Sequence, residues 1–399
     1  MNAEQVQEQI HAAFAGLPVP KPRKLIRHGH DYERSGETKI QQALAGKSWQ
    51  SLTPEFLAKW WSSFGYLSPE AYRYYLPAIL MAALQEPLND HNQKHTAVWM
   101  LRPSFWDLYY NGEDNELLPI QSAFTRDQYL AVCAFLGLMR HQLVGYPHIV
   151  MQALHWGWNR YPNPELEAAN AYYEMLRTFS YPDPQDPEIS ALLHEIRAAF
   201  AQTPYPGDDQ LSGSEQGDEP AENAMELRGI PWLTAHPILL ARCHTALSFL
   251  STDGFRYYLP AFLSADLLAF DSVWKAHADA NWESNAEPVF ELTRGLYDDS
   301  KEKFDMMAFP ELLTGVIDRL EEAGFSREEA LEMLKRNREQ KPTPPIDWYK
   351  YTVDRMKPFA QEERRAIIHY LEYRAQSEAG IHSGEIHQAL ERYWRPSVQ

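Results

Sequence analysis

Apolar residues recur at helical spacing along nearly the whole chain, and no segment shows a convincing alternation of polar and apolar positions. Several helix starts carry a capping hydroxyl followed by a first-turn proline and an acid, as at Thr53-Pro54-Glu55 and Ser68-Pro69-Glu70. Thr125 and Gln128 have the spacing of a capping box. The pattern therefore predicts an all-α protein built from helical bundles.

One segment of this pattern occurs twice. Residues 49–80 and 232–263 align without a gap at an offset of 183 and are identical at 13 of 32 positions, whereas unrelated windows would agree at about two. The best-matched part reads Arg-Tyr-Tyr-Leu-Pro-Ala and begins at Arg73 in one copy and at Arg256 in the other. We interpret the chain as an internal duplication of one helical unit.

The match extends to both ends of each copy. Aligned pairs near the ends are Phe14 with Phe200, Phe124 with Phe359, and Trp158 with Trp394. In the first copy Phe124 lies 25 positions after Trp99, whereas in the second Phe359 lies 77 positions after the aligned Trp282. The second copy therefore carries an insertion of 52 residues.

Proline clusters divide the chain. They flank one helical stretch, which predicts a first unit at 1–160, a linker helix at 161–186 and a second unit at 187–399. Within the second unit, residues 206–223 are rich in Gly, Ser, Asp and Glu and contain no Lys or Arg. This composition predicts a mobile acidic loop.

The insertion covers about residues 299–345. Apolar residues at helical spacing over 310–338, interrupted by Gly324 and Ser326, predict an antiparallel helical hairpin there. Because the first copy lacks this hairpin, we expect the shared core to form without it.

The two repeated prolines, Pro77 and Pro260, fall where the pattern is otherwise helical. A proline inside a helix removes one hydrogen bond and its ring clashes with the carbonyl four residues earlier. The motif is therefore expected either to join a short helix to a second one that starts at the proline, or to kink a single helix.

Charge limits the classes of partner. The chain has 37 Lys and Arg against 55 Asp and Glu, a net charge of −18, which disfavours nucleic acids and anionic membrane surfaces. The purest apolar run, residues 130–139, is too short to span a bilayer. With a polar N-terminus, these features indicate a soluble cytoplasmic protein.

The two cysteines carry no disulfide framework. Cys133 aligns with Ile368 and Cys243 with Trp60, so each is expected to be a buried packing residue. Two such residues assemble neither a disulfide framework nor a thiolate metal site. With no phosphate loop or dinucleotide fingerprint in the chain, we expect no cofactor.

Three motifs together resemble a known family. Besides Arg-Tyr-Tyr-Leu-Pro-Ala, they are Ala-Ile-x-x-Tyr-Leu at 366–371 and Ala-Leu-x-x-x-Trp at 389–394. In these the chain resembles a bacterial family described only as a domain of unknown function, whose members are single helical units. The resemblance covers each copy nearly end to end, apart from the insertion. It implies a helical fold and brings no activity, ligand or catalytic residue.

The repeated motif supplies the main candidate ligand-binding residues. They are Arg73, Tyr74, Tyr75, Arg256, Tyr257 and Tyr258. An arginine among tyrosines suits an anion or carboxylate, because the planar guanidinium matches two oxygens. The alternative, which we favour, is a structural arginine that binds backbone carbonyls at the proline.

A weaker candidate is a metal site at His91 and His95. Spaced four apart, they share one helix face, as divalent-metal ligands can. Their aligned residues are Trp274 and Ala278, and no His-Glu-x-x-His arrangement supplies a base. A solvated helix face is therefore the favoured interpretation.

Three classes of function follow. The leading hypothesis is an acidic protein-binding module, with an inhibitor or immunity-type partner of a basic protein as one form, because negative charge speeds capture of a positive target. The alternatives are an enzyme whose site gathers Arg73 or Arg256 with an acid or histidine, and a purely structural scaffold. The oligomeric state is left open.

Overall fold

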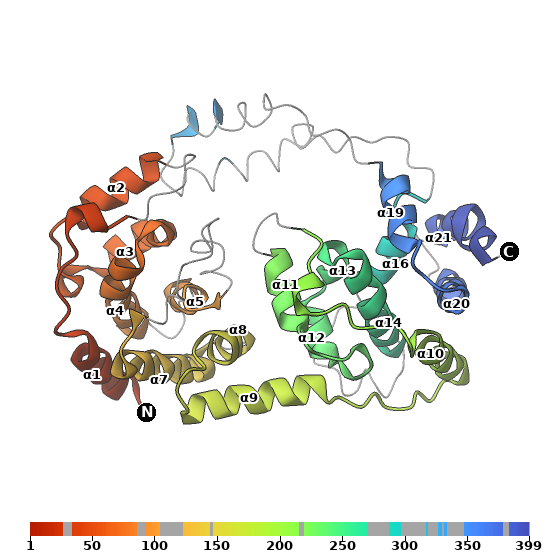
Figure 1. Ribbon diagram of the computed structural model, residues 1–399, viewed down its shortest axis with the longest axis horizontal. Coiled ribbons are helices and arrows are strands. Elements are labelled where there is room, and N and C mark those ends of the chain that lie inside the picture. The colour runs from red at the N-terminus through yellow and green to blue at the C-terminus, as the bar shows by residue number, and fades with distance from the viewer. Residues whose placement is uncertain are drawn as a thin grey trace. The chain divides into compact units, whose positions relative to one another are not determined.

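The computed structural model describes residues 1–26, 34–85, 92–103, 123–143, 147–214, 219–269, 287–296, 317, 326–328, 331–332, 347–377 and 383–398. These residues form helices, short 3₁₀ and π-helical turns and two isolated β-bridges, with no strand among them (Figure 1). The prediction of an all-α protein is confirmed. Within these ranges, each helix is too short or too polar to cross a bilayer.

The chain divides into two compact units. Unit 1 comprises Met1–Thr178 and Gln216–Glu222, and unit 2 comprises Phe179–Glu215 and Asn223–Gln399. The helix predicted as a linker is α9, Pro164–Arg177, which packs against α7 and the turn η5 of unit 1. Its buried side chains are Leu166, Ala169, Tyr173 and Leu176. This helix is therefore part of unit 1.

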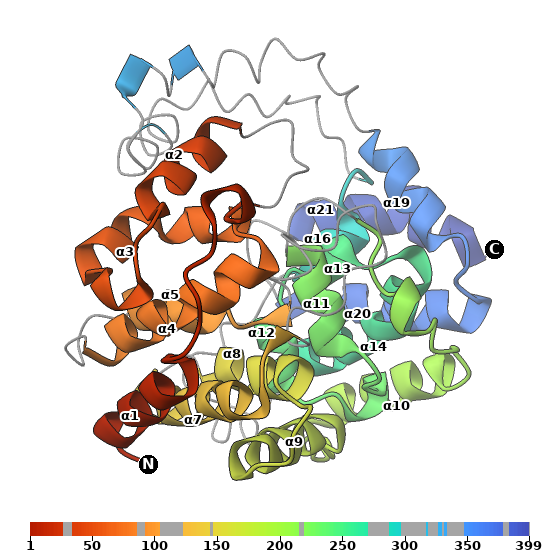
Figure 2. The ribbon, with the colours of Figure 1, turned by 60° about the vertical axis from the view of Figure 1, so that its left-hand side comes forward.

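Unit 1 is built around helix α4, Pro69–Gln85, whose residues are buried on nearly all sides. Helix α1 packs against both α4 and α7 (Figures 1 and 2). The other elements of the unit are α1 (Ala3–Phe14), η1 (Pro22–Lys24), α2 (Arg34–Leu44), η2 (Trp49–Ser51), α3 (Pro54–Trp60), η3 (Trp61–Tyr66), α5 (Asn92–Trp99), α7 (Arg126–Gln142), α8 (Pro147–Gln152), η5 (Ala153–Gly157) and α9.

Unit 2 is built around helix α14, Thr252–Ala269, which is also buried on nearly all sides. Helix α10 packs against α14 and α20. Helix α11 (Glu219–Leu227) is divided between the units after Glu222, and its C-terminal part belongs to unit 2. The other elements are α10 (Pro187–Phe200), η6 (Asp208–Gln210), η7 (Trp232–Thr234), α12 (Pro237–Arg242), α13 (Ala246–Phe249), α16 (Glu287–Thr293), α19 (Trp348–Met356), α20 (Gln361–Ser377), α21 (Ser383–Ala389), η9 (Leu390–Trp394) and η10 (Pro396–Val398).

Pro77 and Pro260 both lie inside these central helices, each of which runs through its proline. The alternative of two helices joined at the proline is therefore wrong. Tertiary burial outweighs the lost hydrogen bond, because Pro77 and its neighbours from Tyr74 to Leu80 are buried. In α14, the Ser264 hydroxyl donates to the Pro260 carbonyl at 2.7 Å.

A tyrosine from each central helix closes the end of another helix. The Tyr75 hydroxyl donates to the carbonyls of Leu44 and Lys47 at 3.0 and 3.1 Å, where α2 ends. The Tyr258 hydroxyl donates to Leu227, where α11 ends, and to Ile230. Gly46 and Gly229 adopt φ angles of 73° and 65° at these ends, a conformation that favours glycine.

A π-helical turn near the C-terminal end of each unit presents a buried tryptophan. Trp158 follows η5, and its indole N–H donates to the Leu101 carbonyl at 3.0 Å. Trp394 ends η9, and its indole N–H donates to the Leu292 carbonyl at 2.9 Å. Both side chains are fully buried, so each turn ties the end of its unit to the core.

The predicted acidic loop is shorter than expected. Helix α11 begins at Glu219, so the last five residues of the range 206–223 are helical. An acidic first turn with proline at its second position favours a helix start there. Leu211 is fully buried, and its carbonyl accepts from the Ser251 N–H at 2.8 Å.

A buried ionic network holds α16 and α19, on either side of the insertion, to the core of unit 2. The Glu291 carboxylate accepts from Ser248 Oγ at 2.7 Å and from Arg355 Nη1 at 3.0 Å. The Arg355 guanidinium also donates to the Leu250 carbonyl at 2.8 Å and lies over the Phe255 ring. Buried charges of this kind are stable only when paired.

The described residues on the two sides of the insertion lie next to each other. The Thr352 hydroxyl donates to the Arg294 carbonyl at 2.8 Å, and Gly295 approaches the backbone of Trp348 so closely that a Cβ would lie 2.5 Å from its carbonyl carbon. The hairpin predicted for 310–338 lies outside the described residues, apart from 317, 326–328 and 331–332.

Because the residues that flank the insertion are in contact, replacing residues 297–346 with a flexible linker of about six residues should leave unit 2 folded. Shortening a loop lowers its closure entropy, so the free energy of unfolding should be unchanged or up to about 2 kcal/mol higher. The measurement is thermal unfolding followed by circular dichroism. Aggregation of the shortened protein would contradict the accessory role of the segment.

A matched variant, Gly295→Ala, tests the contact between Gly295 and Trp348. The φ of +70° at Gly295 and its contact with Trp348 both disfavour a side chain. The substitution should therefore lower the free energy of unfolding by more than about 1 kcal/mol.

The first helix of the repeated window is capped differently in the two units. In unit 1 the Thr53 hydroxyl accepts from the Phe56 N–H at 3.3 Å. In unit 2 the aligned His236 accepts through Nδ1 from the Ile238 N–H at 3.1 Å. Burial lowers the pKa of His236 from its ordinary value of 6.5, and the Arg242 guanidinium lowers it further.

His236 should make stability depend on pH. The folded protein disfavours the imidazolium, so the unfolded state binds the proton first; the contribution of His236 is complete above pH 6.5 and falls as the pH drops toward the lower folded pKa. His236→Asn keeps a capping acceptor that does not titrate, so it should flatten the loss of stability between about pH 6.5 and 5. Urea unfolding at several pH values measures this slope, and Thr53→Asn should leave it unchanged.

Candidate functional site

The arginine of each repeated motif points to the first turn of another helix. In unit 1, Arg73 Nε donates to Gln128 Oε1 of α7 at 2.9 Å. In unit 2, Arg256 Nε and Nη2 donate to the Glu363 carboxylate of α20 at 2.9 to 3.1 Å. The expectation that these arginines bind backbone carbonyls at the proline was therefore wrong in its detail, although both arginines do join structural elements.

The two acceptors have different surroundings. Gln128 closes a capping box with Thr125 and donates through Nε2 to the Ala13 carbonyl at 3.1 Å. Glu363 accepts from the Thr203 hydroxyl and from the Ala360 N–H, each at 2.7 Å. The Glu363 side chain is 2% exposed, and the donors engage both of its oxygens.

The electrostatics of the two sites differ accordingly. Arg256 is neutralised by a carboxylate, whereas Arg73 has a neutral amide as its partner. Burial lowers the pKa of Arg73, and the negative charge of Glu70 opposes this effect. Glu363 therefore already neutralises the charge of Arg256, which weakens its attraction for an incoming anion.

The tyrosines of the motif are core residues. Tyr75 and Tyr258 are fully buried, and burial raises the pKa of Tyr75 to about 12 and that of Tyr258 well above its ordinary value. Tyr74 and Tyr257 pack edge-on against them, with ring centroids 4.9 and 5.0 Å apart. Each arginine and its tyrosine pair thus lie on one helix, but the hydroxyls of Tyr75 and Tyr258 donate to backbone carbonyls.

The histidine pair is not assembled into a metal centre within the described part of the chain. His91 lies outside the described residues, and His95 is half-buried in α5. Among the described residues there is no group of three or more His, Cys, Asp and Glu that could hold a metal ion.

A cavity of about 500 Å³ adjoins Arg256, between α10 and α20. We call it the Arg256 cavity, and it is lined by Glu195, Ala198, Ala199, Gln202, Thr203, Arg256, Ala360, Glu362, Glu363 and Arg365. Beside it, His369 Nδ1 lies 2.8 Å from the Glu195 carboxylate. The cavity gathers acids and bases, but the buried acid next to the arginine is occupied by structural hydrogen bonds.

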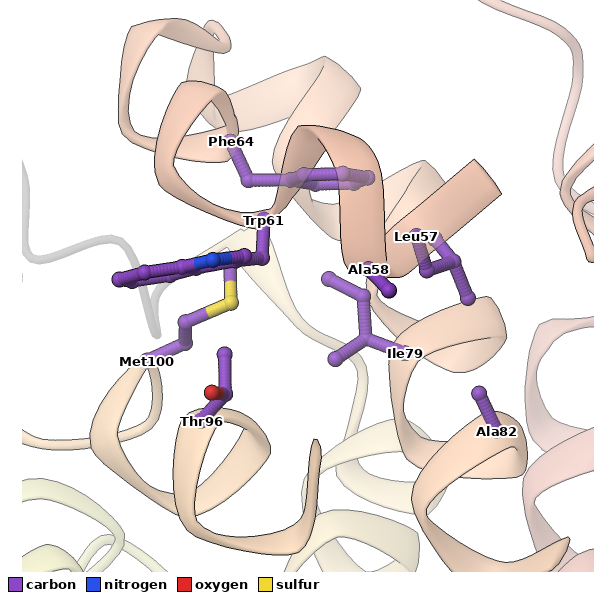
Figure 3. A pocket seen from close by; sticks show the side chains of 8 residues that line it. All are labelled: Leu57, Ala58, Trp61, Phe64, Ile79, Ala82, Thr96 and Met100. Carbon is purple, nitrogen blue, oxygen red and sulfur yellow. The ribbon is translucent and has the colours of Figure 1, made fainter. Parts of the chain in front are cut away.

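A second cavity, of about 330 Å³, is apolar and belongs to unit 1 (Figure 3). We call it the Trp61 cavity. Helices α3, α4 and α5 and the turn η3 supply its lining, which consists of Leu57, Ala58, Trp61, Phe64, Ile79, Ala82, Thr96 and Met100. Its size and its single hydroxyl are typical of sites that bind an apolar group.

Trp61 is the exposed member of this lining. The indole is 46% exposed and meets the Trp99 ring edge-on at 6.3 Å. In Figure 3 it stands beside the Met100 side chain, with Leu57, Ile79 and Ala82 on the other side of the cavity. An exposed tryptophan next to an apolar cavity is typical of an interaction surface.

The aligned surface of unit 2 is more completely buried. Pro54, Phe56 and Trp60 of α3 are half-buried, whereas the aligned Pro237, Leu239 and Cys243 are buried. Trp61 aligns with His244 at the same offset of 183. The sequence analysis did not identify this surface. The adjacent residues Trp60 and Trp61, which align with Cys243 and His244, were a signal for it.

Unit 2 instead contains a buried polar cluster. The Tyr370 hydroxyl donates to Asp266 Oδ2 at 2.7 Å, and Arg374 Nη1 lies 3.4 Å from the same oxygen. All three side chains are almost completely buried. The aligned residues of unit 1 are apolar, namely Ala83, Phe135 and Met139.

Comparison with known proteins gives a family match. Residues 2–159 match a family of unknown function, DUF6714, which agrees with the resemblance to a domain of unknown function. No curated protein and no solved structure matches the chain. The matched range covers nearly all of the main segment of unit 1, including the Trp61 cavity.

The arginine pairs give a prediction about stability. Glu363→Gln reproduces the neutral partner found in unit 1 and should lower the free energy of unfolding by about 1.5 to 3 kcal/mol. Arg256→Met should cost about 3 to 5 kcal/mol, because it leaves a buried carboxylate without its cation. The control, Gln128→Glu, exchanges the hydrogen bond to Ala13 for an ion pair and should be nearly neutral. Urea unfolding measures all three, and a wild-type stability for Glu363→Gln would contradict the assignment.

Proposed function

We propose that the chain is a duplication of one helical unit and that unit 1 binds a partner protein through the Trp61 cavity. The 13 identities in 32 aligned positions support the duplication. So do three features that recur in the two units: the buried proline helix, the tyrosine that closes another helix, and the arginine bound to the first turn of α7 or α20.

The observation that carries the binding function is the exposed indole of Trp61 beside an apolar cavity of about 330 Å³. Binding energy at protein interfaces concentrates in a few aromatic or arginine anchors that fill pockets. The cavity has room for an apolar side chain of a partner, and Trp61 would cover that side chain once it is bound.

The charge of the chain indicates the kind of partner. A net charge of −18 attracts a basic protein over a long range, and opposite charges mainly raise the rate of association. We therefore propose a basic protein as the partner, with an inhibitor or immunity-type role as one form of the function.

An enzyme is the second candidate, favoured by the Arg256 cavity of about 500 Å³ and its several acids. Against an enzyme, the buried acid of this cavity is poorly placed to act as a general base. A general base needs a free lone pair, and Glu363 accepts from Thr203, Ala360 and Arg256. Binding of a partner at the Trp61 cavity does not require a free lone pair on any buried acid.

The binding function predicts that Trp61→Ala weakens capture of a basic partner from the native host by about tenfold or more, as loss of an interface anchor does. The matched control is Tyr349→Ala, because Tyr349 is also an exposed aromatic side chain, at 50%. Affinity is measured with the purified partner by calorimetry at two salt concentrations, and raising the salt should weaken binding to the wild type. An unchanged affinity for Trp61→Ala would refute the proposed surface.

A further inference from the structure

A third cavity, of about 280 Å³, lies in unit 1 and is lined by the start of α3 and by α4. We call it the His11 cavity, and its lining consists of His11, Trp49, Gln50, Leu52, Pro54, Ala78, Met81, Ala82 and Gln85. Ala82 lines both this cavity and the Trp61 cavity. Its apolar walls come from α3, α4 and the turn before α3, and its polar groups are His11, Gln50 and Gln85.

In unit 2, the chain itself covers the aligned position. The extended residues before α10 run along the start of α12. The Phe179 N–H donates to the Thr234 carbonyl at 3.1 Å, and the Tyr181 hydroxyl donates to the Ala235 carbonyl at 2.8 Å. The Phe179 ring also packs on the His236 ring, with centroids 4.4 Å apart.

The alignment places this segment where unit 1 has its cavity. Ala235 aligns with Leu52, which lines the His11 cavity. Burial raises the pKa of Tyr181, and the nearby Arg197 guanidinium opposes that effect. Arg197 aligns with His11 itself. Tyr181 is thus bound at Ala235 and is close enough to Arg197 to feel its charge, and the residues aligned with these two, Leu52 and His11, both line the cavity.

We propose that the His11 cavity binds an extended peptide segment of a partner protein, with two aromatic residues in the pattern Phe-x-Tyr. The segment Phe179-Ser180-Tyr181 in unit 2 is the template for this ligand. Its main-chain N–H and its tyrosine hydroxyl both donate to backbone carbonyls, and the aligned carbonyls of unit 1 belong to Ser51 and Leu52. A free phenol would make only one of these two hydrogen bonds, so the pattern favours a peptide.

This inference rests on the equivalence of the two units proposed above, and it does not depend on the Trp61 cavity. It gives the protein a second binding surface on α3, for a ligand of defined chemistry. The two surfaces can be tested separately, because Met81 lines only the His11 cavity and Trp61 lines only the other.

The test uses a fluorescein-labelled synthetic peptide with the sequence of residues 178–183, Thr-Phe-Ser-Tyr-Pro-Asp, titrated with the full-length protein by fluorescence anisotropy. Two aromatic anchors on a short flexible peptide should give a Kd of roughly 10 µM to 1 mM. A peptide with both aromatic residues replaced by alanine should not bind.

Met81→Trp fills the cavity and should weaken binding at least tenfold. Gln50→Trp, at an exposed position of the rim, tests the same cavity if Met81→Trp does not fold. Met175→Trp is the matched control, because Met175 is 44% exposed on α9 and lies outside the cavity lining. Trp61→Ala should leave peptide binding unchanged, even if it abolishes capture of the basic partner.

Three results would overturn the proposal. The first is absence of peptide binding up to millimolar concentration. The second is binding that Met81→Trp and Gln50→Trp leave intact but that Phe179→Ala with Tyr181→Ala increases, because the peptide would then occupy the groove of unit 2. The third is self-association in sedimentation that Tyr181→Ala abolishes, which would assign the cavity to a second copy of this chain.

Discussion

Each unit depends on one helix that is buried on nearly all sides, so every polar group on that helix must find a partner inside the protein. The arginine of α4 or α14 binds the first turn of α7 or α20, and the second tyrosine binds the carbonyls at the end of α2 or α11. These two bonds join the central helix to elements that are distant in sequence. The motif of each central helix therefore serves packing and hydrogen bonding.

The two units satisfy this constraint in different ways. Unit 1 pairs its arginine with a neutral amide, whereas unit 2 uses a buried carboxylate and adds two further ionic clusters around Glu291 and Asp266. Paired buried charges give little net stability and strongly penalise the loss of one partner. Unit 1 leaves apolar surface open around α3, with two cavities lined by α3 and α4 and an exposed tryptophan.

Sequence reasoning was most successful where local rules act. The capping box at Thr125 and Gln128 and the caps at Thr53 are present as expected, because a cap is decided by a few neighbouring residues. At Pro77 it left two alternatives open, and burial of the whole helix decided for a single helix despite one missing hydrogen bond. It also assigned the wrong partners to Arg73 and Arg256, because their acceptors lie 55 and 107 residues away.

The sequence by itself determined the helical class, the aligned halves and the central motif, because helical periodicity, capping and identity between copies are properties of the chain alone. Only the tertiary structure decided which surfaces are open. Whether α3 or α12 is covered depends on segments elsewhere in the chain, such as Phe179 and Tyr181 over the start of α12. A cavity is the space that remains after distant elements have packed, and no local pattern of residues records it.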